Sequence, residues 1–190
     1  MMSNFGINRE DAFILLNDFV KNEKMIQHCL ASEAVLKALA EKLGENKEMW
    51  SIAGLLHDID VEITNADLKL HVLEAEKILI NKGVNIEIVD AIKRHNEAAH
   101  DLKRETKFHF ALAAGETITG LITATALVYP DKKLENVKVK SITKRMKEKA
   151  FAASVNRDII MECEKIGLTI DEFAEISLRA MQSIHEKLDL

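Results

Sequence analysis

The sequence predicts a single all-α domain over residues 1–190, folded as a compact helical bundle. Helix breakers are scarce, because the 190 residues include only one proline and seven glycines. Apolar residues recur at three- and four-residue spacing, which is typical of amphipathic helices. Strand-like alternation is nearly absent, and its best candidate, NVKVK (136–140), is short and flanked by charge. The length is sufficient for one substantial hydrophobic core.

The first three predicted helices have recognisable ends. An apolar stripe indicates a helix in REDAFILLNDFVK (9–21). The next, MIQHCLASEAVLKALAEKLG (25–44), ends on Gly44, which suits a left-handed C-cap. The third, NKEMWSIAGLLHDI (46–59), opens on Asn46, a good N-cap residue.

Helices are also predicted along the rest of the chain. HVLEAEKILINKG (71–83) stops at a glycine, and NIEIVDAIKRH (85–95) follows it. A long apolar helix, 105–129, is halted by Pro130, which restricts the residue before it. Further helices fill the C-terminal third, the last opening with the capping box TIDE (169–172). There is no internal repeat and no linker.

Composition limits the environment and the partners. The formal net charge of −5 gives no electrostatic reason to expect a nucleic-acid polymer as partner. Cys29 and Cys163 form no CxxC pair, so a disulfide scaffold is not expected. The N-terminus does not read as a secretory signal, and the most apolar stretch, 118–129, is shorter than the roughly 20 residues that span a bilayer. We expect a cytoplasmic protein without membrane contact.

Four of the seven histidines fall at the ends of four successive predicted helices. His28 lies near the start of the second helix and His57 at the end of the third. His71 begins the fourth and His95 ends the fifth. In an antiparallel bundle, the end of one helix and the start of the next share a rim, so these side chains can converge.

Such a cluster has the chemistry of a metal site. Imidazole nitrogens and carboxylate oxygens without a thiolate suit manganese, iron, cobalt, nickel or zinc. Asp58, next to His57, can use its second oxygen to reach a neighbouring ion. The other histidines, His100, His109 and His185, are interpreted as packed or solvated residues.

The order of these residues resembles the HD-domain superfamily of metal-dependent hydrolases. The matching stretches cover most of residues 24–128 and are QHCLASEAVLKALAEKLG, GLLHDID, HVLEAEKIL, AIKRHNE and GETITGLI. An HD dipeptide alone would be weak evidence, but the full ordered set on a helical chain is strong. The later segment KAFAASVNRD also looks like the small bacterial HDIG-type members.

The resemblance implies a ligand set, position by position. His28 matches the first histidine ligand of the family, and His57 and Asp58 match the HD pair. Asp58 is expected to bridge two metals where two are present. His71 and His95 match the histidines that complete a second metal position in dinuclear members. One or two divalent transition-metal ions are therefore expected.

Three positions, in two stretches, depart from the family pattern. Glu116 stands where the last ligand is usually aspartate, and it reaches one methylene further, so either the backbone adjusts or this ligand is lost. Many relatives read HD-Ile-Gly-Lys, whereas this chain has Asp60 and Val61 after HDI. A phosphate-facing cation is thus replaced and a negative charge added, which disfavours cyclic dinucleotides as substrates.

The resemblance implies hydrolysis of a phosphate ester through metal-activated water. The expected substrate class is a nucleotide or another small phosphorylated metabolite. Asp58, His71 and His95 are the candidate catalytic residues. Cations that could contact the substrate phosphate are Lys144, Arg145, Lys149 and Arg157, whose alternative reading is solvated surface charge.

Two other functions stay open at this point. Some relatives with the fuller histidine set carry two irons and use dioxygen to oxidise a substrate. A non-catalytic module that binds a metal or ligand is the other alternative. The apolar C-terminal helix FAEISLRAMQSI (173–184) could form a homodimer face, although packing within the domain is the favoured interpretation.

Overall fold

Residues 5–190 are described by a computed structural model, and in this range the chain is all-α without any strand. Two helices of 21 residues form its centre, α2 (Glu23–Leu43) and α6 (Lys107–Leu127). The other α-helices are α1 (Arg9–Phe19), α3 (Lys47–Leu56), α4 (Leu73–Asn81), α5 (Ile86–His95), α7 (Val139–Met146), α8 (Arg157–Met161), α9 (Ile170–Gln182) and α10 (His185–Leu188). Three short 3-10 helices, η1 (Glu97–Ala99), η2 (Leu134–Asn136) and η3 (Glu162–Ile166), join them.

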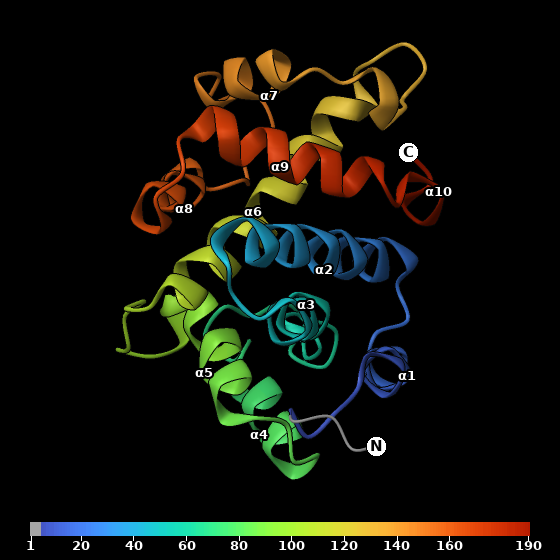
Figure 1. Cartoon of the computed structure of the whole chain (residues 1–190). Helices are drawn as coiled ribbons and strands as arrows, with labels where there is room; N and C mark the ends of the chain where they lie inside the picture. Colours follow the sequence, from blue (N-terminus) through green and yellow to red (C-terminus); the bar gives the residue numbers. More distant parts are fainter. Residues whose placement is uncertain (1–4) are drawn as a thin grey trace.

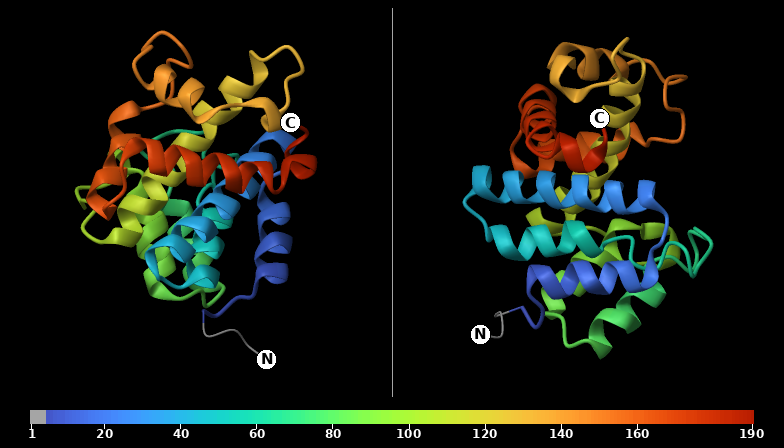
Figure 2. Two further views of the ribbon diagram at one scale, coloured as in Figure 1. Left: turned by 45° about the horizontal axis from the view of Figure 1, so that its top comes forward. Right: turned by 90° about the vertical axis from the view of Figure 1, so that its right-hand side faces the viewer.

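Figure 1 shows how these helices are arranged around α2. α1, α3, α4 and α5 lie on one side of α2, and α7 to α10 lie on the other. α6 contacts α2 and also helices of both groups, including α5, α7 and α9. The right-hand view of Figure 2 shows α3 lying between α1 and α2. The two groups therefore share the core that α2 and α6 build between them.

The predicted helix ends are confirmed at several caps. The Asn46 side chain accepts a hydrogen bond from the backbone N–H of Met49 at 3.0 Å, which starts α3. Gly44 ends α2 with a φ of 72°, a left-handed conformation that glycine adopts without steric cost. Thr169 and Glu172 form the capping box of α9. Local side-chain chemistry thus fixes where these helices begin and end.

The weak strand candidate at 136–140 is helical at its end. Its residue Val139 begins α7, and Ile142 and Met146 follow on the same helix face. Ile142 is fully buried, and Val139 and Met146 pack against the core. The three- and four-residue spacing of these apolar side chains outweighs the local alternation of NVKVK.

A glycine allows α2 and α3 to touch. A Cβ atom on Gly54 would lie 2.6 Å from the carbonyl oxygen of Ser32 in α2, which is closer than van der Waals contact permits. The absence of a side chain at Gly54 therefore lets the two backbones approach. This contact brings His28 of α2 beside His57, the C-cap of α3.

α6 is the central core helix. By length and composition it is the one helix in the described range that could cross a membrane, but 61% of its most apolar stretch is buried inside the bundle. Such burial is what the core helix of a folded domain shows. Its apolarity is accounted for by contacts with the surrounding helices.

Helix α9, which contains most of the apolar segment 173–184, directs its apolar stripe into the domain. Phe173, Leu178 and Met181 are buried, and α9 packs on α2 and α7. Packing within the domain thus explains this stripe, and the homodimer stays a prediction. Cys29 and Cys163 are buried as free thiols, in agreement with the expected lack of a disulfide.

Candidate metal centre

Four histidines and one aspartate meet where α2, α3 and α5 approach the segment before α4. The two Nε2 atoms of His28 and His57 are 3.1 Å apart, and those of His71 and His95 are also 3.1 Å apart. Asp58 lies between the pairs. Its Oδ2 is 3.6 Å from His28 Nε2 and 3.4 Å from His57 Nε2. Its Oδ1 is 3.2 Å from His71 Nε2 and 3.6 Å from His95 Nε2.

Two of the rings are oriented by their own helices. His57 Nδ1 lies 2.9 Å from the carbonyl oxygen of Gly54, and His95 Nδ1 lies 2.6 Å from that of Ile92. A carbonyl oxygen only accepts, so each Nδ1 must carry the proton. Each histidine ends a helix and bonds a carbonyl three residues back. A neutral ring in this position presents an unprotonated Nε2 to the centre.

His28 is oriented by a hydroxyl group from α6. Its Nδ1 lies 3.0 Å from Thr119 Oγ1, and that hydroxyl donates its proton to the carbonyl oxygen of Glu116 at 2.6 Å. Thr119 therefore accepts from His28 Nδ1–H. The Nε2 of His28 is left unprotonated, as in the two rings above.

His71 is oriented by the buried carboxylate of Asp60. Asp60 Oδ1 accepts from His71 Nδ1 at 2.7 Å, and Oδ2 accepts the backbone N–H groups of Val72 and Ala75 at 2.8 and 3.0 Å. Val72 has a φ of 78°, which is strained for a β-branched residue, and its side chain cannot cap α4. Asp60 thus fixes the His71 ring, holds the strained residue and caps the helix that follows.

Burial and neighbouring charge separate the pKa values of these groups. Burial lowers the pKa of His57 to about 3 and lowers that of His28 as well. Burial opposes the charge of His71 too, but the hydrogen bonds that its ring donates to Asp58 and Asp60 outweigh burial and raise its pKa to about 10. Burial also opposes the charge of Asp58, yet the surrounding imidazoles bring its pKa well below the ordinary value. Asp58 is therefore a carboxylate.

Glu116 lies at the edge of the cluster. Its Oε2 is 3.8 Å from His28 Nε2, and its Oε1 accepts a hydrogen bond from the hydroxyl of Thr117. Burial raises the pKa of Glu116 to about 8. It is outside the two groups of ligand atoms that lie within 4.8 Å of one another, which are His28, His57, Asp58 and Asp58, His71, His95. A small side-chain movement would be needed for Glu116 to join the first group.

The donor set fits divalent ions. Four Nε2 atoms and the Asp58 carboxylate face one another, and the two nitrogens of each pair, 3.1 Å apart, repel unless a cation or a proton lies between them. Burial raises the pKa of the nearby Cys29 thiol well above its usual value, so it stays protonated. Nitrogen and oxygen ligands without thiolate suit manganese, iron, cobalt, nickel or zinc. His28, His57 and Asp58 would hold one ion, and Asp58, His71 and His95 a second.

A cleft of about 670 Å³ opens onto this centre. Asp58, His71, His95 and Glu116 form its floor. Its walls come from the segment after α5 and from α8 with the residues flanking it, and they carry Asn96, Glu97, Arg104, Ser154, Asn156, Asp158 and Glu162. Substrate therefore has access to the second ligand group and to the bridging carboxylate.

Two of the four cations predicted to contact substrate organise a loop beside the cleft. The Arg157 guanidinium donates to the carbonyl oxygens of Ala152 and Val155 at 2.6 and 2.7 Å, and also to that of Phe151. Arg145 stacks over the Phe151 ring, 4.4 Å from its centroid. These contacts fix the loop that presents Ser154 and Asn156 to the cleft.

The other two cations lie on the same side of the domain. Lys144 forms an ion pair with Glu148 at 3.6 Å, and Lys149 is exposed in the turn that follows α7. Within residues 5–190, neither lysine lines the cleft, and neither does Arg145 or Arg157. The structure thus brings five of the six predicted ligand residues together, with Glu116 at the edge of the cluster, and leaves the four predicted phosphate contacts outside the cleft.

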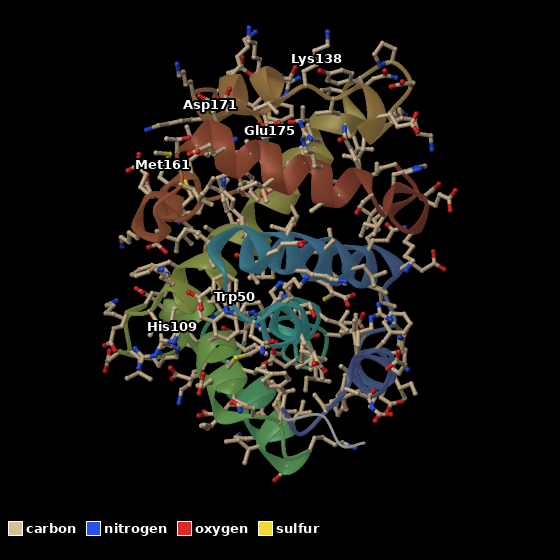
Figure 3. All side chains as sticks on the ribbon, viewed as in Figure 1. Trp50, His109, Lys138, Met161, Asp171 and Glu175 are labelled. Carbon is tan, nitrogen blue, oxygen red and sulfur yellow. The ribbon has the colours of Figure 1, made fainter. Side chains whose placement is uncertain are left out.

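The remaining histidines lie apart from the centre. His109 Nε2 is 3.0 Å from Asp90, and its Nδ1 accepts backbone N–H groups at the start of α6. His109 and Trp50 lie in the same part of the bundle (Figure 3), where both line a shallow pocket. His100 Nε2 bonds the carbonyl of Lys93 at 2.7 Å, and His185 lies near Glu135. These three histidines therefore stabilise local structure and take no part in the metal centre.

Sequence reasoning did not identify Arg104, Asn156 or Glu162 as part of the cleft. Arg104 and Glu162 are 58 residues apart and meet only because the chain folds back after α7. Asn156 caps α8 in the structure, but no local pattern in the sequence connects it to the histidines. Asp60 stands out in GLLHDID as a departure from the family glycine, and in the structure its carboxylate orients the His71 ring.

Comparison with known proteins identifies the family. The HD-domain family model matches residues 25–119, which is half of the chain and includes all six predicted ligand positions. The chain belongs to the HD-domain family, which is part of a superfamily of metal-dependent phosphohydrolases. No curated protein and no solved structure matches this chain.

Proposed function

We propose that this protein is a metal-dependent phosphohydrolase that cleaves a small phosphate ester. The observation that carries the proposal is the arrangement of four histidine Nε2 atoms around Asp58. Two of them lie near one oxygen of its carboxylate, and the other two lie near the second oxygen. Two adjacent cation positions with one shared carboxylate form the arrangement used to bind the attacking and leaving oxygens of a phosphoryl group. Membership of the HD-domain family supports the same reaction class.

A divalent ion bound here would act as a Lewis acid and lower the pKa of a water molecule toward neutrality. The residues of this chain would orient the reaction. Asp58 would hold both positions at a fixed separation, because its two oxygens face opposite histidine pairs. His71 and His95 lie on the cleft floor, so the substrate would enter on their side. Glu116, once deprotonated, would complete the ligand set beside His28.

In the proposed reaction, water attacks phosphorus and the P–O bond to the organic group breaks. A monoester yields the alcohol and inorganic phosphate, and a diester yields the alcohol and a phosphate monoester. A nucleotide or another small phosphorylated metabolite would fit a cleft of about 670 Å³, which is in the usual range for small-molecule sites. The cytoplasm remains the expected location.

One observation also favours a second candidate, a di-iron oxygenase. Each of the two groups contains two histidines and an oxygen of Asp58, so the two positions have matching nitrogen-rich ligands. Such positions can hold redox-active iron as well as a hydrolytic metal. Metal analysis of protein from cells, combined with dioxygen-uptake measurements, distinguishes the two. Zinc or manganese without dioxygen uptake would eliminate the oxygenase.

The proposal is tested with metal-loaded protein and a panel of phosphate monoesters and diesters. We expect the wild type to hydrolyse at least one ester, measured as alcohol release, and His57→Ala to lose at least a hundredfold in rate, because one group then lacks a buried ligand. His185→Ala, altered on the surface, is the matched control and should retain activity. Circular dichroism would verify that both variants fold. Equal turnover by wild type and His57→Ala would contradict the proposal, and tight metal binding without turnover would favour a non-catalytic binding module.

A further inference from the structure

The charge of the cleft walls contains information about the substrate. Apart from Asp58 and Glu116, the carboxylates that line the cleft come from three residues, Glu97, Asp158 and Glu162. In the described part of the chain, Arg104 is the one Lys or Arg side chain that lines the cleft. The walls therefore carry more negative than positive charge, which is unusual for a site expected to bind an anionic phosphoryl group.

Arg104 is not free to bind a phosphate. Its Nε and Nη2 donate to the two oxygens of Glu162 at 2.7 and 3.3 Å. Its Nη1 donates to the backbone carbonyls of Arg94 and His95 at 3.1 and 3.2 Å, and its Nη2 lies 3.6 Å from Glu97 Oε1. These five contacts match the five N–H donors of a guanidinium. Arg104 holds the end of α5 in place, and its side chain is only 8% exposed.

Asp158 is the uncompensated charge at the mouth of the cleft. It lies in the first turn of α8 and is exposed. Among residues 5–190, no lysine or arginine forms an ion pair with its carboxylate, whereas Glu97 pairs with Lys103 and Glu162 pairs with Arg104. A charged group of the substrate that reaches this wall would meet a free carboxylate.

Two neutral groups beside Asp158 provide hydrogen-bonding capacity. Asn156 uses its Oδ1 to cap α8, accepting from the N–H groups of Asp158 and Ile159 at 3.0 and 3.4 Å. Its Nδ2 is thereby left for the cleft. The exposed hydroxyl of Ser154 lines the same wall, on the loop that Arg157 fixes. This wall suits an organic group that carries hydroxyl or amino substituents.

We propose that the cleft selects a singly phosphorylated substrate whose organic part is neutral or cationic, with Asp158 as the residue that discriminates by charge. This inference rests on the proposed function, because it places the phosphoryl group at the metal centre and the organic part against the wall that carries Asp158. A second phosphate or a carboxylate on the organic part would face Asp158 without a compensating cation. The wall thus disfavours nucleoside polyphosphates and acidic sugar phosphates.

The test compares three ligands of similar size that differ in the charge of the organic part: phosphoethanolamine, glycerol 1-phosphate and 3-phosphoglycerate. Dissociation constants would be measured by calorimetry with manganese-loaded wild type, Asp158→Asn and Glu164→Gln. Asp158→Asn removes the charge while keeping the side-chain size. Glu164→Gln is the matched control, because Glu164 is an exposed acid of the neighbouring η3 that does not line the cleft.

We expect Asp158→Asn to weaken phosphoethanolamine binding about threefold to fivefold and to strengthen 3-phosphoglycerate binding by a similar factor, as for a partly exposed charge pair. Glycerol 1-phosphate binding should be unchanged, and Glu164→Gln should alter none of the three. Comparing each ligand across variants removes any direct affinity of its carboxylate for manganese. The effects should shrink as salt is added.

Identical changes for all three ligands, no change in any, or no binding of any would overturn the inference. Hydrolysis is measured separately on the same samples. Binding with the expected charge order but without phosphate release would contradict the proposed reaction and leave the charge selection in place. Phosphate release with no dependence on Asp158 would contradict the charge selection alone.

Discussion

Replacing Asp60 with asparagine should loosen the metal centre without touching a predicted ligand. The carboxylate accepts three hydrogen bonds: one from the His71 ring and two from the backbone N–H groups of Val72 and Ala75. An amide has one acceptor oxygen and one donor nitrogen. If its oxygen keeps the two backbone bonds, its NH₂ group faces His71 Nδ1–H, and two donors oppose each other in a buried site.

The magnitude follows from these contacts. One hydrogen bond to a charged group is lost, and such a bond contributes about 1.5–3 kcal/mol, so we expect Asp60→Asn to lower the free energy of unfolding by about 2 kcal/mol. His71 is then released to adopt the tautomer with the proton on Nε2, which faces Asp58 and His95. Loss of the partner that orients a ligating histidine typically weakens metal binding by about 10- to 100-fold.

The assay is a competition titration of manganese or zinc against a chelator, performed at a temperature at which circular dichroism shows the variant folded. The matched control is Asp67→Asn, an exposed residue of the same loop whose side chain accepts one backbone hydrogen bond that an amide retains. We expect the control to bind metal like the wild type. Unchanged metal affinity in Asp60→Asn would refute the argument that this carboxylate orients His71.

Three further predictions follow from the centre and the fold. In the metal-free protein, the pKa values of Glu116 and His71 are raised to about 8 and 10. Between pH 6.5 and 8 the folded state therefore holds more protons on these two groups than the unfolded chain does. The melting temperature of the metal-free protein should therefore fall across this window, and metal binding should release protons, which calorimetry in two buffers measures; a flat pH profile would contradict these assignments. Asp58→Asn should abolish binding of both ions, seen by elemental analysis, whereas retention of two ions would show that Asp58 does not bridge. Gly54→Ala should lower stability by about 1–3 kcal/mol in urea titrations, because its Cβ would lie 2.6 Å from Ser32 O, and an unchanged midpoint would show that α2 and α3 can separate freely.

The helices and the ligand cluster could be predicted because their signals are local or ordered along the chain. Asn46 and Gly44 mark helix ends through their own backbone and side-chain chemistry. Three of the four histidines lie at or next to a helix end, and their rings meet at one rim of the bundle. His28 joins them because Gly54 allows α2 to approach α3.

The cleft could not be predicted in the same way, since its walls depend on contacts between distant segments. Arg157 reads in the sequence as an available cation, but its guanidinium is used by carbonyl groups of residues 151–155. Nothing in the sequence around Arg104 indicates its role, which depends on contacts with Glu162 and with the end of α5 in the folded chain. Charge in a sequence therefore indicates which groups exist, whereas the fold decides which of them face the substrate.

The most direct test of the account is a crystal structure of manganese-loaded protein with anomalous data collected near the manganese edge. We predict two anomalous peaks on opposite sides of the Asp58 carboxylate, one among His28, His57 and Asp58 and the other among Asp58, His71 and His95. Protein loaded with manganese that shows no peak at Asp58, or peaks only at other residues, would contradict the claim that this cluster is a metal centre.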